Sequence, residues 1–230
     1  MSSTAKTRRT RAQNSEYVVD SLKSIGLQPH PESRLTRMHR VLSQHLGAIA
    51  PDHADFEIAL EAERDMQVLG FVFDNALGQP ADSEFVRLAK NAIKDSLLPQ
   101  DDRSLSKGRD AQFELFIAAV CQAAGMRPVV REEPDVTCLV NSTKFGIAAK
   151  RIKNIANLEA RINKGAQQIQ DSRLPGFIAL DTSIALNRDN QRISTPIHEQ
   201  QFQVLHWSAL RRFMANKFDF CRMATGRSLE

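Results

Sequence analysis

Apolar residues recur at helical spacing through the first hundred positions of the chain. Spacings of three and four predict helices over residues 15–26, about 35–49, 54–76 and from Asp82 to Leu97. The second of these helices shows the pattern most clearly, at Leu35, Met38, Val41, Leu42, Leu46 and Ile49. No strand pattern precedes Arg109. Residues 15–100 are therefore expected to form a helical domain.

The pattern changes after a polar segment, residues 99–107, which we interpret as a linker. A helix with an apolar stripe follows and ends at Gly125. Short β-rich runs occupy 126–132, 136–140 and 144–152, and Asn141-Ser142 between the last two predicts a hairpin. A helix over 157–172, a strand over 177–183 and a terminal helix over 198–217 complete the predicted elements. The expected fold is α+β or α/β: a helical bundle, then an α-β-β-β-α-β core with a mixed sheet in a domain spanning 104–230.

Composition narrows the class of protein. The chain has 230 residues, of which 42% are hydrophobic, so a buried core is expected. No apolar run reaches the roughly 20 residues that a membrane helix needs, and no apolar segment of a secretory signal follows the N-terminus. Cys121, Cys138 and Cys221 are odd in number and lie in apolar surroundings, as buried thiols of a cytoplasmic protein do. The chain contains no CxxC or HxxxH, which argues against a structural zinc site.

Basic residues gather in two places. Residues 1–14 form a Ser/Thr-rich tail with Lys6, Arg8, Arg9 and Arg11, expected to be disordered and either to touch nucleic acid or to remain solvated. The second group surrounds the third strand of the core and suits a phosphate-bearing partner: Lys144, Lys150, Arg151, Lys153, Arg161 and Lys164.

One constellation carries candidate chemistry. Because side chains alternate along a strand, Lys150 shares a face with Ala148 and Gly146. Asp135 opens the neighbouring hairpin strand, where its carboxylate can approach Lys150. Glu114 lies beside the apolar stripe of the preceding helix and can supply a second carboxylate. Oxygen ligands of this kind suit Mg²⁺ or Mn²⁺, and a lysine beside such an ion can orient or deprotonate a water molecule.

A helix glutamate, a Pro-Asp dipeptide, a hairpin and a lysine, in this order, resemble the PD-(D/E)xK nuclease superfamily with its restriction-endonuclease-like fold. The resemblance covers residues 109–183. It implies that Asp135 binds the metal with Glu114 and the backbone carbonyl of Ala149, and that Lys150 is catalytic. It also places a glutamine of the second helix, Gln167 or Gln168, near the site.

The sequence departs from this motif at one position. The acid expected two residues before the lysine is Ala148 here. Either Glu114 or Glu133 takes its place, or the fold is retained and catalysis is lost. The expected function is therefore a Mg²⁺-dependent nuclease that cleaves DNA according to structure or ends. The alternative is a degraded nuclease fold that binds nucleic acid or serves in assembly. The chain lacks the GxGxxG, P-loop and GxSxG motifs of other α/β enzymes.

The positions of five basic residues in the chain indicate contacts with a nucleic-acid partner. Lys144, Arg151 and Lys153 flank the proposed site, and Lys107 and Arg109 begin the first core helix, so all five are candidate nucleic-acid contacts. The segment 106–109 either holds a phosphate at the helix N-terminus or is an ordinary helix entry. The helical domain is expected to serve packing, homodimerisation or binding of a partner protein. A DNA-reading helix with Arg34, Arg37 and Arg40 is the less favoured interpretation.

Overall fold

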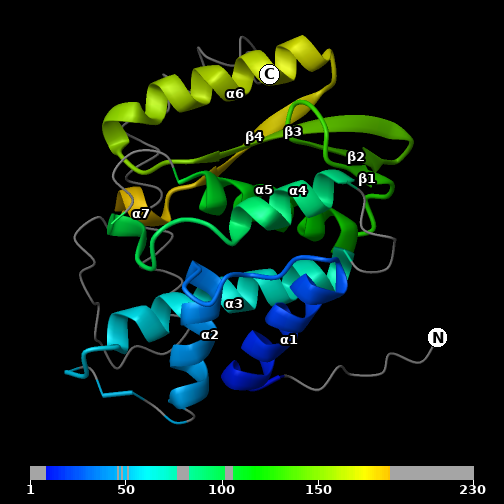
Figure 1. Cartoon of the computed structure of the whole chain (residues 1–230). Coiled ribbons are helices and arrows are strands. Elements are labelled where there is room, and N and C mark those ends of the chain that lie inside the picture. The colour runs from blue at the N-terminus through cyan, green and yellow to red at the C-terminus, as the bar shows by residue number, and fades with distance from the viewer. Residues whose placement is uncertain are drawn as a thin grey trace, which may run out of the picture.

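Helices precede a small sheet along the chain, and the two parts lie in layers (Figure 1). The computed structural model describes residues 9–45, 47, 49–50, 52–76, 83–101 and 106–186. The helices of this part are α1 (Arg11–Ser24), α2 (Arg34–Gln44), α3 (Phe56–Ala76), α4 (Ser83–Ala92), η1 (Pro99–Asp101), α5 (Lys107–Ala123), η2 (Ile155–Asn157), α6 (Leu158–Ser172) and α7 (Ser183–Leu186). The strands are β1 (Val129–Val130), β2 (Val136–Val140), β3 (Thr143–Arg151) and β4 (Gly176–Asp181). The predicted C-terminal helix and Cys221 lie outside the described residues.

Helix α1 begins at Arg11, four residues before the predicted start. Thr10 accepts from the backbone N–H of Gln13, and the Gln13 side chain accepts from the backbone N–H of Thr10, which forms a capping box. Arg9 pairs with Asp74 at 2.9 Å and lies over the Tyr17 ring. The prediction of a disordered tail to residue 14 is therefore wrong from residue 9 onward, because a local cap and an ion pair fix this segment.

Helix α5 serves two hydrophobic cores. Its residues Ala111, Leu115 and Ala119 pack into the core of the helical half. Ala118 and Cys121 pack with β2 and β3 instead. The expected linker also participates, since Pro99 is buried in η1. The boundary near residue 100 thus separates two sets of elements, but both sets pack against the same helix.

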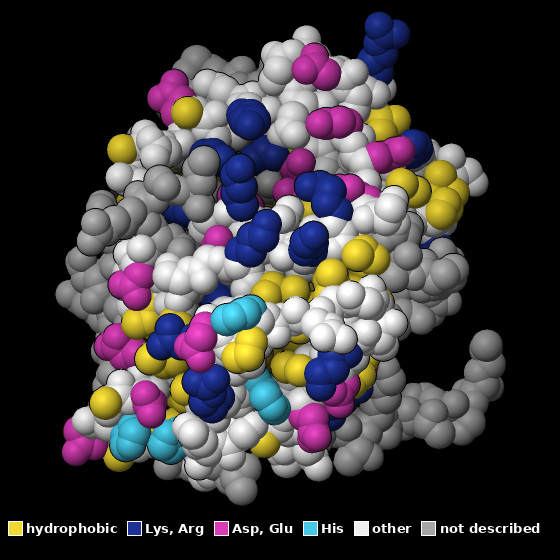
Figure 2. All heavy atoms as spheres, viewed as in Figure 1, with side chains coloured by type: hydrophobic (Ala, Val, Ile, Leu, Met, Phe, Trp, Pro, Cys, Tyr) yellow, Lys and Arg dark blue, Asp and Glu magenta, His cyan; other side chains and the backbone are white. Residues whose placement is uncertain are grey.

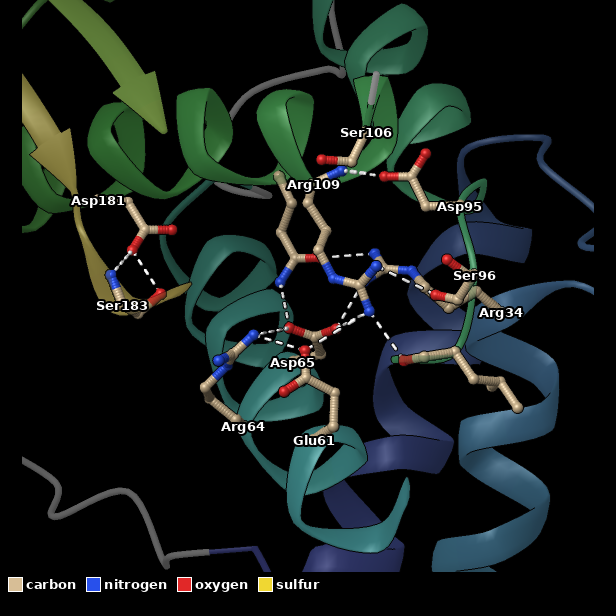
Figure 3. Close-up of polar contacts among 12 residues, drawn as sticks. Arg34, Glu61, Arg64, Asp65, Asp95, Ser96, Ser106, Arg109, Asp181 and Ser183 are labelled. Atoms are coloured by element: carbon tan, nitrogen blue, oxygen red, sulfur yellow. Dashed lines mark hydrogen bonds and ion pairs between the residues drawn. The ribbon is translucent and has the colours of Figure 1, made fainter. Parts of the chain in front are cut away.

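A buried network of charges joins α2, α3 and α5 (Figure 3). Arg34 donates to Asp65 at 2.5 Å and to Gln112 at 2.6 Å, and Gln112 donates to Asp65 at 3.0 Å. Arg109 reaches into the same group from α5. Burial lowers the pKa of Arg34 to about 10, although the Asp65 carboxylate opposes this shift. Because Arg34 is 2% exposed, it cannot read DNA, and the helix-reading interpretation of α2 is wrong for this residue.

The sheet has four strands in the order β1-β2-β3-β4. β1 with β2 and β2 with β3 are antiparallel, and β3 with β4 is parallel, so the sheet is mixed as predicted. Asn141 and Ser142 adopt φ of 46° and 66°, the left-handed pair that a two-residue hairpin turn requires. β1 contains only two residues, fewer than the predicted run of seven. The structure is therefore α+β, with helices preceding the sheet.

Helices cover both faces of β3. α5 lies on one face of the sheet and α6 on the other, as Figure 1 shows. Residues 146–151 of β3 are consequently all buried, on both faces of the strand. Cys121 and Cys138 are buried free thiols in this layer, as predicted. Among the described residues, no helix has the length and apolar character needed to cross a membrane.

Substitution Asp65→Ala should destabilise the fold by about 3–5 kcal/mol, because it leaves Arg34 buried without its carboxylate. The measurement is urea unfolding followed by circular dichroism. Asp20→Ala is the matched control, since the exposed Lys23–Asp20 pair should contribute less than about 1 kcal/mol. Equal losses for the two variants would contradict a stabilising role for the buried network.

Candidate active site at the open end of the hairpin

The site forms where the β2–β3 ladder ends. Val136 opposite Ile147 is the last pair, and β3 then continues to Arg151 beside β4 alone. Because alternate residues of a strand direct their N–H and C=O to the same side, Ala149 directs both toward the space beyond β2. Asp135 occupies this position, and its Oδ2 accepts from the Ala149 N–H at 2.8 Å. A side chain thus replaces the missing strand partner.

Lys150 completes an ion pair with Asp135. Its Nζ lies 2.5 Å from Asp135 Oδ2 and 3.2 Å from the carbonyl oxygen of Ala149. Both side chains are largely buried, with exposures of 8% for Lys150 and 15% for Asp135. The lysine, the aspartate and the backbone carbonyl that the sequence assigned to one site therefore meet there.

The two candidate glutamines of α6 differ in position. Gln168 Nε2 donates to the Pro134 carbonyl at 2.9 Å and contacts Asp135 Oδ1 at 3.3 Å. The same nitrogen lies 3.4 Å from Glu133 Oε2. Gln167 instead bonds Asp171 on the exposed side of α6. Gln168 therefore orients Asp135 and brings Glu133 to the rim of the site, whereas Gln167 takes no part.

Glu114, on α5, interacts electrostatically with Asp135 and Lys150. Burial, and to a smaller extent the Asp135 carboxylate, raise the pKa of Glu114 to about 7. Lys150 and Arg87 act in the opposite direction. Glu114 is therefore poised to gain or lose a proton near neutral pH, a property common among groups that act in acid–base or metal chemistry.

The donor set suits a hard cation. Asp135, Glu114, Glu133 and the Ala149 carbonyl offer oxygen atoms only, which are the ligands that Mg²⁺ and Mn²⁺ take. The Lys150 ammonium group already contacts two of these donors, which shows that they stabilise a positive charge. Ala148 is fully buried on the Lys150 face, so the missing acid has no counterpart there. Gln168 contacts both Glu133 and Asp135, and the Asp135 charge acts on Glu114, but in the described part of the chain the three carboxylates do not converge as one ligand group.

Two of the five predicted nucleic-acid contacts lie in the interior. Arg109 donates to the carbonyls of Ser96 and Leu97 at 3.1 and 2.8 Å. Arg151 bonds Asp181 at 2.9 Å and Ser106 at 3.1 Å. Both arginines are less than 10% exposed, so the prediction is wrong for them, because strand and helix packing directs their guanidinium groups inward.

The other three predicted contacts are more accessible. Lys107 is exposed at the start of α5, and Lys144 is exposed and pairs with Glu132 at 2.6 Å. Lys153 is half-buried. Burial raises the pKa of Asp110, and the charge of Lys153 opposes part of this rise.

A second group of potential ligands was not foreseen. One ligand atom each from His45, His53 and Asp55 lie within 4.8 Å of one another near the start of α3. The group has neither of the CxxC and HxxxH spacings, because its residues lie between α2 and α3 and not on one helix. His53 Nδ1 accepts from the Asp55 backbone N–H at 3.1 Å, so that nitrogen already has a partner. We assign this group of His45, His53 and Asp55 no role in the candidate site.

Comparison with known proteins finds no matching family model, no matching curated protein and no matching solved structure. Function is therefore inferred from the geometry of the site.

Gly146 makes room for the segment that carries Asp135. A Cβ at this position would lie 2.9 Å from Cγ of Pro134, closer than side chains approach. Gly146→Ala should displace Pro134 and lower the free energy of unfolding by about 1–3 kcal/mol. Thermal unfolding compares it with Gly47→Ala, where the added Cβ meets nothing within 4 Å. An unchanged Gly146→Ala protein would contradict this role.

The raised pKa of Glu114 predicts a pH dependence of stability. Between about pH 5 and 7, the folded protein keeps a proton that the unfolded chain has released, so stability falls as pH rises. Glu114→Gln does not titrate and should lose less stability over this range. Urea unfolding at pH 5 and 8 tests this difference, with Glu133→Gln as the control at the exposed rim. Parallel pH profiles for Glu114→Gln and wild type would rule out the assigned shift.

Proposed function

We propose that this protein is a Mg²⁺-dependent nuclease that hydrolyses phosphodiester bonds in DNA through a PD-(D/E)xK-like site. The observation that carries the proposal is the ion pair of Asp135 and Lys150, 2.5 Å apart at the open end of a hairpin. These residues are fifteen positions apart in the chain, Asp135 directly before β2 and Lys150 in the neighbouring β3, an arrangement that fits the resemblance. The surrounding acids and Gln168 provide further support.

The order of elements also supports this assignment. α5, β1, β2, β3, α6 and β4 follow one another as helix, three strands, helix and strand, around a mixed sheet covered by a helix on each face. A restriction-endonuclease-like core has this element order. In the proposal, the Lys150 end of β3 is the catalytic end of this core.

Each residue then has a chemical role. Hydrolysis adds a water oxygen to phosphorus, breaks one P–O ester bond and leaves an alkoxide that must gain a proton. Lys150, an ammonium group in its ion pair with Asp135, orients the water, and its charge offsets that of the phosphate. The proton that the water releases passes to solvent, and solvent supplies the proton that the alkoxide gains. Asp135, Glu114 and the Ala149 carbonyl would hold Mg²⁺, which supplies Lewis-acid polarisation of the phosphate. Gln168 fixes the Asp135 carboxylate, and Glu114 must be ionised to serve as a ligand.

A second function is favoured by one specific observation. Ala148 is fully buried where the motif has an acid, so the site has one fewer carboxylate next to Lys150. If Glu114 and Glu133 do not replace it, the protein is a nucleic-acid-binding or assembly module on a degraded nuclease fold. In both cases we propose a cytoplasmic protein that acts on nucleic acid.

Cleavage assays test the proposal. Linear, circular, nicked, branched and single-stranded DNA are incubated with Mg²⁺ or Mn²⁺, and with chelator as the metal-free control. Asp135→Asn and Lys150→Met should lower the rate at least about 100-fold. Gln168→Ala should lower it roughly tenfold through loss of orientation, while its neighbour Gln167→Ala should cut like wild type.

Two results would contradict the proposed mechanism. Cutting that survives Lys150→Met, or that persists in chelator, would place the activity elsewhere. DNA binding without cleavage by the wild type would support the degraded-fold alternative instead.

A further inference from the structure

We propose that the exposed face of α4 binds the sugar-phosphate backbone of duplex DNA and leads it to the site on α5 and β3. This inference deepens the proposed function, since it gives the helical half a role in holding the substrate. The residues concerned are Arg87, Lys90 and Lys94.

The three cations form a single stripe. They are spaced three and four positions apart, which places them on one side of α4 and its C-terminal end. All three are exposed. The opposite side of α4 is buried in the core of the helical half through Phe85, Leu88 and Ala89. The orientation of the stripe is therefore fixed by hydrophobic packing.

The stripe lies next to the candidate site. α4 packs on α5, the helix that carries Glu114, and the charge of Arg87 opposes the rise in the pKa of Glu114. At the other end, a Cβ at Gly108 would lie 2.8 Å from the carbonyl oxygens of Asn91 and Lys94. The end of α4 thus touches the start of α5, where Lys107 is exposed. Cationic side chains therefore extend from the site to the first turn of α5.

Figure 2 shows the same arrangement on the surface. Lys and Arg side chains gather across the middle of this view, where Figure 1 places α4, and acidic side chains lie around a hollow beside them. Among the described residues, no acidic side chain forms an ion pair with Lys90 or Lys94, although Lys94 donates to Asn91 at 3.2 Å. Their charges are available to a partner.

The chemistry of the stripe favours duplex DNA. Arg87 and Lys90 are one helical turn apart, about 5 Å along the axis of α4, and Lys94 follows just beyond its end, a spacing comparable with that of successive phosphates along a duplex. Proteins that hold single strands use exposed aromatic rings as stacking platforms. The exposed face of α4 has no aromatic residue, since Phe85 is buried. A row of cations without such rings suits the phosphates of a duplex, independent of base sequence.

Glu84 provides a test in which the affinity for duplex DNA should rise and not fall. It pairs with Arg87 on the surface and so offsets part of the positive charge of the stripe. Glu84→Gln should strengthen duplex binding, whereas Lys90→Gln/Lys94→Gln should weaken it. A variant that was merely damaged would not produce a gain.

Binding is measured by fluorescence anisotropy with a 20-base-pair DNA duplex in chelator, so that no cleavage is required. The Lys90→Gln/Lys94→Gln protein should bind about tenfold more weakly at 0.1 M salt. Its plot of log affinity against log salt should be less steep by about 2, since each phosphate contact contributes about 0.9. Lys23→Gln/Arg40→Gln removes two exposed charges from α1 and α2 and is the matched control, expected to bind like wild type.

The outcomes separate this inference from the proposed nuclease activity. Equal affinity and salt slope for wild type and Lys90→Gln/Lys94→Gln overturn the α4 surface, even if cleavage depends on Asp135 and Lys150. Selective weakening supports the surface, even if no DNA is cut. If the wild-type protein does not bind the duplex, or binds single-stranded DNA more tightly, the inference about α4 is overturned. Unchanged urea midpoints for the variants exclude unfolding as the cause of weaker binding.

Discussion

The buried ion pair between Arg34 and Asp65 joins α2 to α3, and its polar contacts reach α5, the helix that packs against both sets of elements. It lies among other charged groups that are almost fully buried, and Gln112 extends it from α3 to α5. Burial raises the pKa of Asp65, but Arg34 outweighs this effect and the net shift is downward. Burial and the Asp65 carboxylate raise the pKa of neighbouring Glu61. Such a network adds little stability compared with a well-packed apolar core, but it penalises any other register of the three helices.

The candidate site depends on a second local constraint. β3 is longer than its partner β2, so the backbone of Ala149 lacks a strand neighbour on the β2 side, and the Asp135 carboxylate accepts from its N–H instead. The carboxylate that would bind a metal is thus also the group that ends the sheet. Gly146, Pro134 and Gln168 then fix its position from three sides. The Asp135 side chain therefore has a structural role, as the hydrogen-bond partner of Ala149, in addition to its proposed role as a metal ligand.

Much of the sheet half could be predicted from local signals. Asn141-Ser142 specified the hairpin, the hairpin set the register, and the register brought Asp135 to Lys150. The orientations of Arg109 and Arg151 could not be predicted in this way. Their inward direction depends on carbonyls and acids from distant elements, including Ser96, Leu97 and Asp181. The position of α4 beside Glu114 is likewise a tertiary property, so its cations gave no signal in the sequence.

The sharing of α5 between two cores limits how the chain can be divided. Its residues from Ala111 to Ala119 pack in part into the helical half, and Glu114 lies in this stretch. A fragment that begins near residue 104 would expose Ala111, Leu115 and Ala119 to water and lose the packing that sets the angle of the helix. The sheet half is therefore not an autonomous module that recombination could move into another protein. Insertion or deletion at this junction would alter both halves together, so the two must evolve as a unit.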